Sequence, residues 1–186
     1  MNRLTEYLDI KIKGDKVKKI VRECFNMIVV PVLLALFCSK VLIVNATIPS
    51  GSMENTILPG DRIIGSRLAY LFQEPKRDDI IIFRFPDDES QVFIKRVIGL
   101  PGETVRIVDG RVYIDGADLP LEEIYLKEAP EGSFGPYEVP QDSYFVMGDN
   151  RNHSHDSRFW DNQYVEKKKI LAKAVFQYYP RLGMVD

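Results

Sequence analysis

The sequence predicts a mainly β protein: one N-terminal transmembrane helix, followed by a domain of folded antiparallel sheets or a partial barrel. Two observations lead to this fold class. A single apolar run lies near the N-terminus, and beyond residue 60 short β-branched segments alternate with turns rich in Pro, Gly and Asp. The chain has 186 residues, 45% hydrophobic and 28% charged, enough to build a buried core in one or at most two domains.

The apolar run from Cys24 to Val44, CFNMIVVPVLLALFCSKVLIV, predicts a membrane anchor. As a helix, 21 residues would extend about 31 Å, which matches the hydrocarbon core of a bilayer. Lys40 lies within about a turn of the end, so its ammonium can reach the interface. The positive-inside rule then predicts a cytoplasmic segment 1–23 and an extracytoplasmic domain 45–186, because basic residues flank the N-terminal side of the run: Lys16, Lys18, Lys19 and Arg22.

Two other interpretations of the run are a cleaved secretory signal and a buried core helix. Ala46 follows the run, but no clean A-x-A site is present, and the run is long for a signal sequence. We therefore expect an uncleaved, single-pass anchor in the plasma membrane.

Charge and cysteine usage exclude several classes of protein. Residues 41–186 hold 17 Lys and Arg against 23 Asp and Glu, so the folded part lacks the basic stripe of a nucleic-acid-binding domain. The two cysteines, Cys24 and Cys38, lie in the apolar run. The folded domain therefore has neither a disulfide framework nor a metal site built on thiolates.

The domain beyond the anchor is expected to consist of short strands. Asp109-Gly110 joins two alternating segments within 103–116 and predicts a tight hairpin. The span 117–142, rich in Pro, Glu and Gly, is expected to be irregular, so the hairpin and this span form a small excursion at about 104–142. Further strands are predicted at 61–67, 80–85, 91–99, 143–150 and 170–180, with an apolar segment at 68–73 that ends at a charged turn.

The chemistry available to the chain depends on which base could activate a serine. A Ser-His-Asp triad needs histidine, and the only histidines, His153 and His155, lie in the polar segment DNRNHSHDSRFW. We interpret that segment as a polar loop; a histidine-based triad, or a metal site with Asp149 and Asp156, remains an alternative. No metal or cofactor is expected.

Lys95 is the other possible base. A lysine can act at neutral pH only when burial depresses its pKa by several units. Lys95 lies in the apolar segment VFIKRVIG, on the same face of the predicted strand as Phe93 and Val97, with Arg96 on the opposite face. A solvent-facing strand lysine is the alternative interpretation.

Five segments in order resemble the type I signal peptidases, the membrane-bound endopeptidases that use a Ser–Lys dyad. PSGSM at 49–53 is similar to their nucleophile box, and IKRVIGLPGE at 94–103 to their lysine box. The other three are LPGDRI at 58–63, RDDIIIF at 77–83 and GDNRNHSHDSRFW at 148–160.

The resemblance implies a role for each matching residue. Ser52 would be the nucleophile and Lys95 its general base. The Ser52 N–H and the Ser50 hydroxyl would form an oxyanion hole. Ser154 would hydrogen-bond to Lys95. The remaining support would come from an Asp156–Arg158 ion pair, from Asp149 and Arg151, and from Met53 packed beside the nucleophile.

The substrates implied by the resemblance are signal peptides of exported pre-proteins, with small residues at the first and third positions before the cut. An extended substrate would pair with a strand edge. We expect that edge at 80–85, with Ile82 and Phe83, and at the segment before Ser52, with Met53 also contacting substrate. The other partners expected are the lipid bilayer, near Met53, Ile57 and Leu58, and the secretion machinery; no nucleic acid is expected.

Two alternative functions remain. A membrane-tethered β-domain could bind secreted chains without cleaving them. A self-cleaving regulator of the SOS-repressor type also pairs Ser with Lys, but it would need a regulatory segment where this chain has its apolar run.

Overall fold

The computed structural model describes residues 16–185, which form two compact units that divide after Leu42. The first unit is helical: residues 16–24, η1 (Phe25–Val29), α2 (Val30–Phe37) and η2 (Cys38–Leu42), of which η1 and η2 are π-helical. The stretch Lys16–Phe37 is long and apolar enough to cross a membrane. No residue of η1 or α2 is buried, so the helix is not a core helix of the described structure.

The helical segment ends two residues earlier than the sequence indicates. Ile43 and Val44 belong to β1 (Ile43–Thr47), which pairs antiparallel with β2 (Arg62–Ser66). The β-branched run at this point suits either a helix or a strand, and pairing with β2 decides in favour of the strand.

The second unit contains two antiparallel sheets. The larger has the order β1-β2-β10-β3-β4-β8-β9, with β11 paired to β10. The smaller has the order β6-β5-β7. The remaining bounds are β3 (Ile80–Arg84), β4 (Val92–Gly99), β5 (Thr104–Val108), β6 (Arg111–Ile114), β7 (Phe134–Glu138), β8 (Ser143–Met147), β9 (Val165–Glu166), β10 (Ile170–Tyr179) and β11 (Gly183–Met184). Short 3₁₀ turns are η3 (Leu68–Tyr70), η4 (Arg151–His153) and η5 (Lys167–Lys169).

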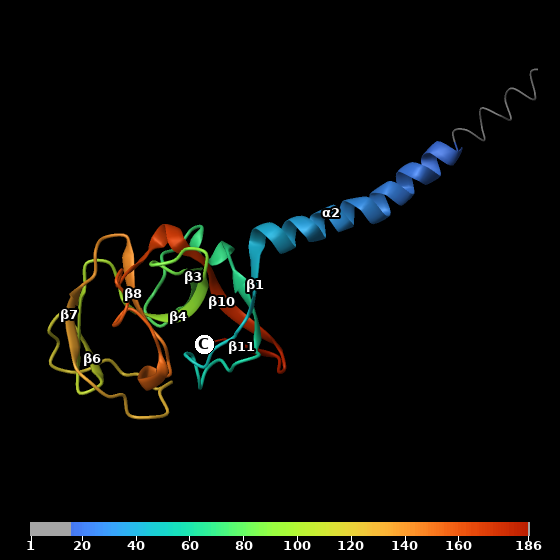
Figure 1. Ribbon diagram of the computed structural model, residues 1–186. Coiled ribbons are helices and arrows are strands. Elements are labelled where there is room, and N and C mark those ends of the chain that lie inside the picture. The colour runs from blue at the N-terminus through green and yellow to red at the C-terminus, as the bar shows by residue number, and fades with distance from the viewer. Residues whose placement is uncertain (1–15, 186) are drawn as a thin grey trace, which may run out of the picture. The chain divides into compact units, whose positions relative to one another are not determined.

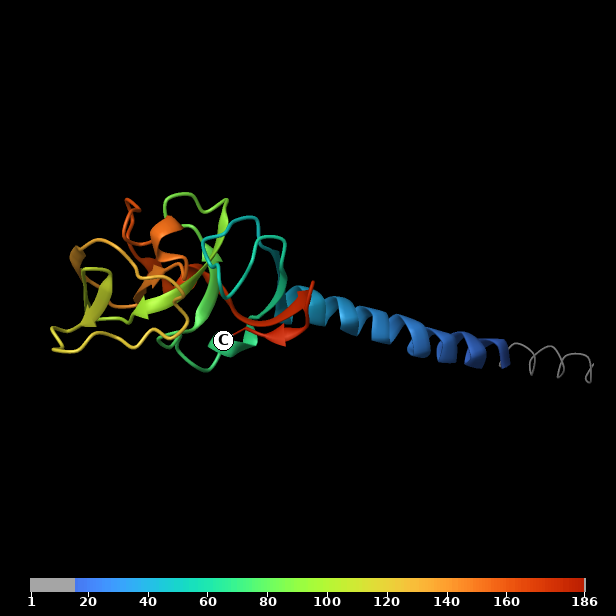
Figure 2. The same ribbon diagram turned by 90° about the horizontal axis from the view of Figure 1, so that it is seen from below.

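Strand β8 joins the two sheets because both of its faces are buried. Tyr144 and Val146 pack into one apolar cluster with Trp160 and residues of β3 and β4, whereas Phe145 and Met147 pack into the cluster beneath the small sheet. Figures 1 and 2 both place the small sheet at one end of the domain and the β10–β11 hairpin at the other. The strands between these two ends are those that surround the site described below.

The predicted fold class is confirmed, and so is each predicted strand. Asp109 and Gly110 have φ of 48° and 78°, as a tight hairpin turn requires. The short strands β1, β7, β9 and β11 were not predicted, β7 because Gly135 and Pro136 give it the composition of a loop. Within the apolar segment 68–73, Leu68–Tyr70 form the 3₁₀ turn η3.

We predict that Gly110→Ala destabilises the domain more than Gly116→Ala. Both glycines have positive φ, 78° and 71°, so each substitution carries the left-handed cost of about 1 kcal/mol. A Cβ at Gly110 would in addition collide with the backbone carbonyl of Pro130, whereas a Cβ at Gly116 would meet open space. The difference in unfolding free energy, measured in denaturant, should exceed about 1 kcal/mol; equal values would contradict the close packing of this turn.

Candidate active site

Ser52 lies on the loop between β1 and β2, and main-chain hydrogen bonds close that loop at its base. The Ile48 N–H donates to the Asp61 carbonyl at 3.0 Å, and the Gly60 N–H donates to the Ile48 carbonyl at 2.8 Å. Met53, the next residue after Ser52, is fully buried in the apolar cluster that also contains Ile48. The loop therefore holds Ser52 in place at the edge of the core.

Lys95 reaches Ser52 from β4, although the two residues are 43 positions apart. Its Nζ donates to the Ser52 Oγ at 2.5 Å and lies 5.8 Å from the centre of the Phe93 ring. The Lys95 side chain is only 3% exposed, and burial lowers its pKa from the ordinary 10.5 to about 8. A substantial share of neutral amine near physiological pH gives the hydroxyl beside it a base that can accept its proton.

Two carboxylates oppose the effect of burial on Lys95. Asp156 and Asp149 both raise the pKa of Lys95, and Arg158 lowers it. Arg96 donates to both oxygens of Asp149 at 2.8 Å, and Arg158 donates to Asp156 at 2.8 and 2.9 Å. The predicted Asp156–Arg158 ion pair is therefore present. Since each carboxylate has a guanidinium partner, its attraction for a proton on Lys95 is partly offset.

The irregular segment 117–133, between β6 and β7, supplies partners for two of these arginines. The Arg96 guanidinium lies 3.9 Å from the centre of the Tyr125 ring. Arg151 donates to both oxygens of Glu123, at 3.0 and 2.5 Å, and also contacts the Tyr125 hydroxyl at 3.3 Å. The side chains of Arg151 and Glu123 are almost fully buried. We name this group, Glu123, Tyr125, Arg96 and Arg151, the arginine clamp.

Sequence reasoning missed most of the arginine clamp. Arg151 and Asp149 were assigned supporting roles, but Arg96, Glu123 and Tyr125 were not. Glu122 and Glu123 are adjacent and identical in type, and the sequence has no signal that distinguishes the buried one from the exposed one.

The segment after β8 holds the Ser52 loop directly. The Asn150 N–H donates to the Ser52 carbonyl at 3.1 Å, and the Asn150 side-chain amide donates to the Gly51 carbonyl at 3.0 Å. A Cβ at Gly148 would collide with the Ser52 carbonyl and the Ser154 hydroxyl. Glycine at this position lets two backbone segments approach closely, which brings the hydroxyl of Ser52 to Lys95.

Ser154 and Ser50 both lie near Ser52. Ser154 is buried, and within residues 16–185 its Oγ has no hydrogen-bond partner, so the bond expected with Lys95 is not formed there. Ser50 is exposed and lines the cavity that contains Ser52.

An open cavity of about 590 Å³ runs past Ser52 and Lys95. It adjoins a second cavity of about 280 Å³ between β1 and β4, and the two share Pro49, Val92, Phe93 and Ile94. We call the two together the cleft. Besides Ser52 and Lys95, the first cavity is lined by Pro49, Ser50, Gly51, Gln91, Val92, Phe93, Ile94, Asn150, His153 and His155.

The strand edge in the cleft belongs to β4, not to the predicted segment 80–85. Strand β3 is an interior strand, paired with β10 on one side and β4 on the other. Strand β4 pairs with β3 from Val92 to Arg96, but its pairing with β8 starts only at Arg96. Within residues 16–185, the main chain of 92–95 therefore lacks a partner strand on the side of the cleft.

Of the three residues expected to bind substrate, one lines the cleft and two are buried in the core. Ile82 contributes to the wall of the second cavity, whereas Phe83 and Met53 are completely buried in apolar clusters. Both side chains are thus closed off from the cleft in this structure, and their contact with substrate stays a prediction. An interior strand buries both of its faces, and β3 does so from Ile80 to Phe83.

The histidines lie on the rim of the cleft rather than in a remote loop. His153 and His155 both line the first cavity, and the His155 ring lies 6.4 Å from those of Phe85, Phe159 and Trp160. The Ser52 hydroxyl is nevertheless paired with the lysine. Within residues 16–185 no group of three or more His, Cys, Asp or Glu side chains could hold a metal ion.

A serine hydroxyl hydrogen-bonded to a buried amine, in an open cleft beside an unpaired strand edge, is the arrangement of a hydrolase that works through a covalent intermediate. Comparison with known proteins identifies the family. The model for "Signal peptidase, peptidase S26" matches residues 21–179. The chain belongs to this family and is a serine peptidase; the resemblance noted in the sequence is confirmed.

Individual relatives cover much of the chain. It is 47% identical to a signal peptidase I of Leptolyngbya laminosa over 145 residues, 73% of this chain and 70% of the relative. It is 34% identical to a signal peptidase I of Bacillus licheniformis, over 90% of this chain and 94% of that protein. The crystal structure of a signal peptidase I from Enterococcus faecalis matches with a TM-score of 0.47 and 35% identity, covering 54% of this chain and 97% of that one.

We predict that Glu123→Ala lowers the unfolding free energy by about 3 kcal/mol or more, because it leaves the Arg151 guanidinium buried without its ion-pair partner. The matched control is Glu122→Ala, whose side chain is exposed and should change stability by less than about 0.5 kcal/mol. Denaturant unfolding of the two variants measures the difference. Similar stabilities would show that the arginine clamp contributes little to the fold.

Proposed function

We propose that this chain cleaves signal peptides from exported pre-proteins, with Ser52 as nucleophile and Lys95 as general base. The observation that supports this most directly is the contact between the Lys95 Nζ and the Ser52 Oγ at the base of the open cleft. Membership of the signal peptidase family supports the substrate class.

The proposed reaction proceeds through an acyl-enzyme. Neutral Lys95 takes the proton of the Ser52 hydroxyl as its oxygen attacks the scissile carbonyl. The Ser52 N–H and the Ser50 hydroxyl stabilise the oxyanion, and Lys95 then gives its proton to the departing amine. In the second half, Lys95 takes a proton from water, the hydroxide attacks the ester, and the proton returns to Ser52.

The supporting residues act through Lys95 and through the Ser52 loop. The Asp149–Arg96 and Asp156–Arg158 pairs limit the charge that Lys95 experiences, and Arg151 fastens the segment after β8 by donating to the Gly148 carbonyl at 3.1 Å. Ser154, buried with no partner within the described chain, is a hydrogen-bonding group available to Lys95 during the reaction.

The cleft suits an extended peptide. Its unpaired main chain at residues 92–95 can hydrogen-bond to a substrate strand, and the Pro49–Ser52 segment forms the opposite wall. The cavity between β1 and β4 has an apolar wall formed by Ile82, Ile94 and Leu171. Small substrate side chains before the cut would occupy such apolar depressions, and larger ones would be excluded by steric overlap.

We propose an uncleaved single-pass topology, with the N-terminal segment cytoplasmic and a catalytic domain at 45–186 outside. Residues 1–15 of that segment lie outside the described part of the chain. The apolar side chains of α2 are exposed within the described structure, which suits contact with lipid. Removal of a signal near Ala46 would cut through β1, where Asn45 and Ala46 pair with Ile64 and Ile63 of β2.

A domain that binds secreted chains without cleaving them is the weaker alternative. Such a protein would need neither the Ser52–Lys95 contact nor the ion pairs around it. The bilayer is the partner of the anchor in this proposal, and the secretion machinery would deliver the substrate.

We predict that Ser52→Ala and Lys95→Ala each reduce kcat by about 10⁴-fold or more, because either change removes one member of a unit that works together. The assay is cleavage of a pre-protein by the full chain in lipid. His153→Ala is the control and should retain most activity, since this side chain lines the cleft without bonding to Ser52. Activity retained by Lys95→Ala but lost in His153→Ala would overturn the lysine base.

We predict that kcat/KM rises with pH and levels off above about 8. The base must be neutral, and the pKa of Lys95 is about 8, so the active fraction should increase about tenfold per pH unit below that value. A pH series with a short peptide substrate measures this profile. A flat profile from pH 5 to 9, or a midpoint near the ordinary histidine value, would contradict it.

A further inference from the structure

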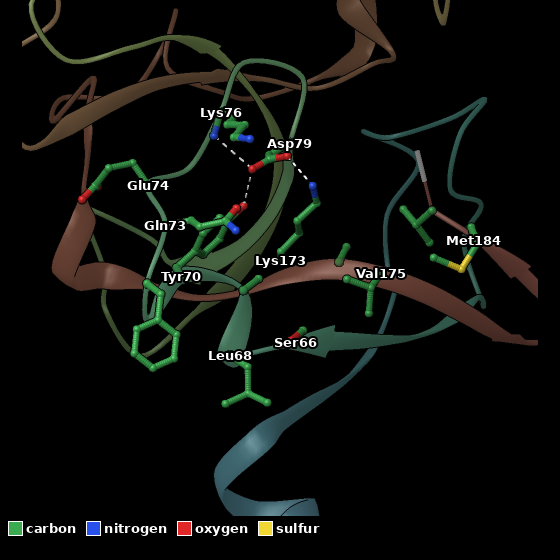
Figure 3. Close-up of a pocket in the computed structure, with 14 residues that line it drawn as sticks. Ser66, Leu68, Tyr70, Gln73, Glu74, Lys76, Asp79, Lys173, Val175 and Met184 are labelled. Carbon is green, nitrogen blue, oxygen red and sulfur yellow. Dashed lines mark hydrogen bonds and ion pairs between the residues drawn. The ribbon is translucent and has the colours of Figure 1, made fainter.

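Buried carboxylates collect hydrogen bonds at two separate places in the domain, and only one of them acts on the nucleophile loop. Asp79 lies in a hollow of about 540 Å³ between η3, β10 and β11. Its carboxylate accepts hydrogen bonds from the Lys173 ammonium at 2.5 Å, the Tyr70 hydroxyl at 2.9 Å and the Lys76 N–H at 3.0 Å (Figure 3). This hollow shares no lining residue with the cleft, so Asp79 fastens strands apart from the catalytic region.

The second place, just after β8, fastens the loop that carries Ser52 at three points. The Thr56 hydroxyl donates to the Asp149 carboxylate at 2.5 Å. The Asn150 N–H donates to the Ser52 carbonyl at 3.1 Å, and the Asn150 side-chain amide donates to the Gly51 carbonyl at 3.0 Å. One residue, Asn150, thus bonds to the peptide group on each side of the Ser52 Cα.

The other side of the Ser52 loop lies in the apolar core. Met53 and Ile57 are completely buried, and of the three loop residues expected near the bilayer only Leu58 is exposed. The loop therefore has buried side chains on one side and the hydrogen bonds to Asp149 and Asn150 on the other. This arrangement leaves the main chain around Ser52 little freedom to turn.

The bond to the Gly51 carbonyl also sets the direction of the Ser52 N–H. The Gly51–Ser52 peptide is trans, and in a trans peptide the C=O and the N–H point to opposite sides. A carbonyl held toward Asn150 therefore turns the Ser52 N–H away from that residue. Within residues 16–185 this N–H donates no hydrogen bond, and Ser52 lines the cleft. A free N–H held in one direction is a preorganised donor for a developing negative charge.

We propose that Asn150 is a positioning residue for the oxyanion hole: its side-chain amide holds the Gly51–Ser52 peptide so that the Ser52 N–H faces the oxygen of the scissile carbonyl during attack. This inference rests on the proposed function, in which Ser52 is the nucleophile. Asn150 acts through the main chain, since within the described chain it bonds to neither the Ser52 hydroxyl nor Lys95. Its bond is therefore expected to affect kcat rather than KM.

Two substitutions at Asn150 separate the direction of the N–H from simple loss of packing. Asn150→Ala removes the side-chain donor. Asn150→Asp is nearly isosteric and keeps the main-chain N–H, but it places a carboxylate oxygen against the Gly51 carbonyl. We expect kcat of the full chain in lipid, taken from the plateau of the pH profile, to fall about tenfold or more in Asn150→Ala and further in Asn150→Asp. KM should stay within about threefold of its original value.

The matched control is Asn152→Asp, the same change of amide to carboxylate two residues along the chain. Asn152 is exposed and bonds to the segment before β7, at Glu128 and Ala129, rather than to the Ser52 loop. Its kcat should stay within about twofold of the original. An equal loss of kcat in Asn152→Asp and Asn150→Asp would contradict the positioning role, because it would indicate a general effect of the added charge.

A peptide aldehyde and the corresponding peptide alcohol provide a second measurement. The Ser52 oxygen bonds to the aldehyde carbon, the hydroxyl proton passes to Lys95, and the former carbonyl oxygen becomes an oxyanion in the hole. The alcohol occupies the cleft without this addition, so its binding also shows that a variant is folded. We expect Asn150→Ala to weaken inhibition by the aldehyde about tenfold or more, and inhibition by the alcohol less than about twofold.

Equal weakening of both inhibitors, or a rise in KM alone, would overturn the proposal, because Asn150 would then contact substrate or only maintain the cleft. Tight binding of the aldehyde that Asn150→Ala leaves unchanged would also overturn it, and would leave the proposed function intact. An aldehyde that binds the unaltered chain no more tightly than the alcohol would instead contradict Ser52 as the nucleophile, and the role of Asn150 with it.

Discussion

The burial of the Lys95 amine beside Ser52 is the constraint on which the rest of the site depends. A protonated lysine cannot accept a proton from a serine, and in water it would stay protonated at neutral pH. The fold therefore surrounds the amine with apolar strand residues and lowers its pKa to about 8. A positive charge nearby lowers the pKa of Lys95 further, and a negative charge raises it.

Two buried carboxylates near Lys95, Asp149 and Asp156, are each paired with an arginine. Asp149 and Asp156 organise the segment after β8, but both favour the protonated lysine. Their arginine partners offset that influence, and the arginines in turn need partners of their own because they too are buried. Glu123 and Tyr125 fulfil this need from the irregular segment between β6 and β7. That segment thus connects to the surroundings of Lys95 through charge rather than through sheet pairing.

The sheet arrangement explains why the cleft is open where it is. Strand β4 has a partner on one side along most of its length, and β8 covers the other side only from Arg96 onward. The residues before that point hold Lys95 and also expose unpaired main chain. In the proposed reaction, one strand would therefore supply both the base, Lys95, and the edge along which an extended substrate binds.

Local sequence patterns predict the apolar helix, the Asp109-Gly110 hairpin and the strands other than β1, β7, β9 and β11, and the resemblance to a known family points to Ser52 and Lys95. These features depend on local periodicity, on turn chemistry and on residue types in a recognisable order. The interior position of β3, the free edge of β4 and the burial of the Glu123 side chain beside the exposed Glu122 depend on the three-dimensional arrangement. The physical reason is that burial, pairing and ion-pair partners are set by residues distant in the chain, and identical neighbours in sequence can face entirely different surroundings.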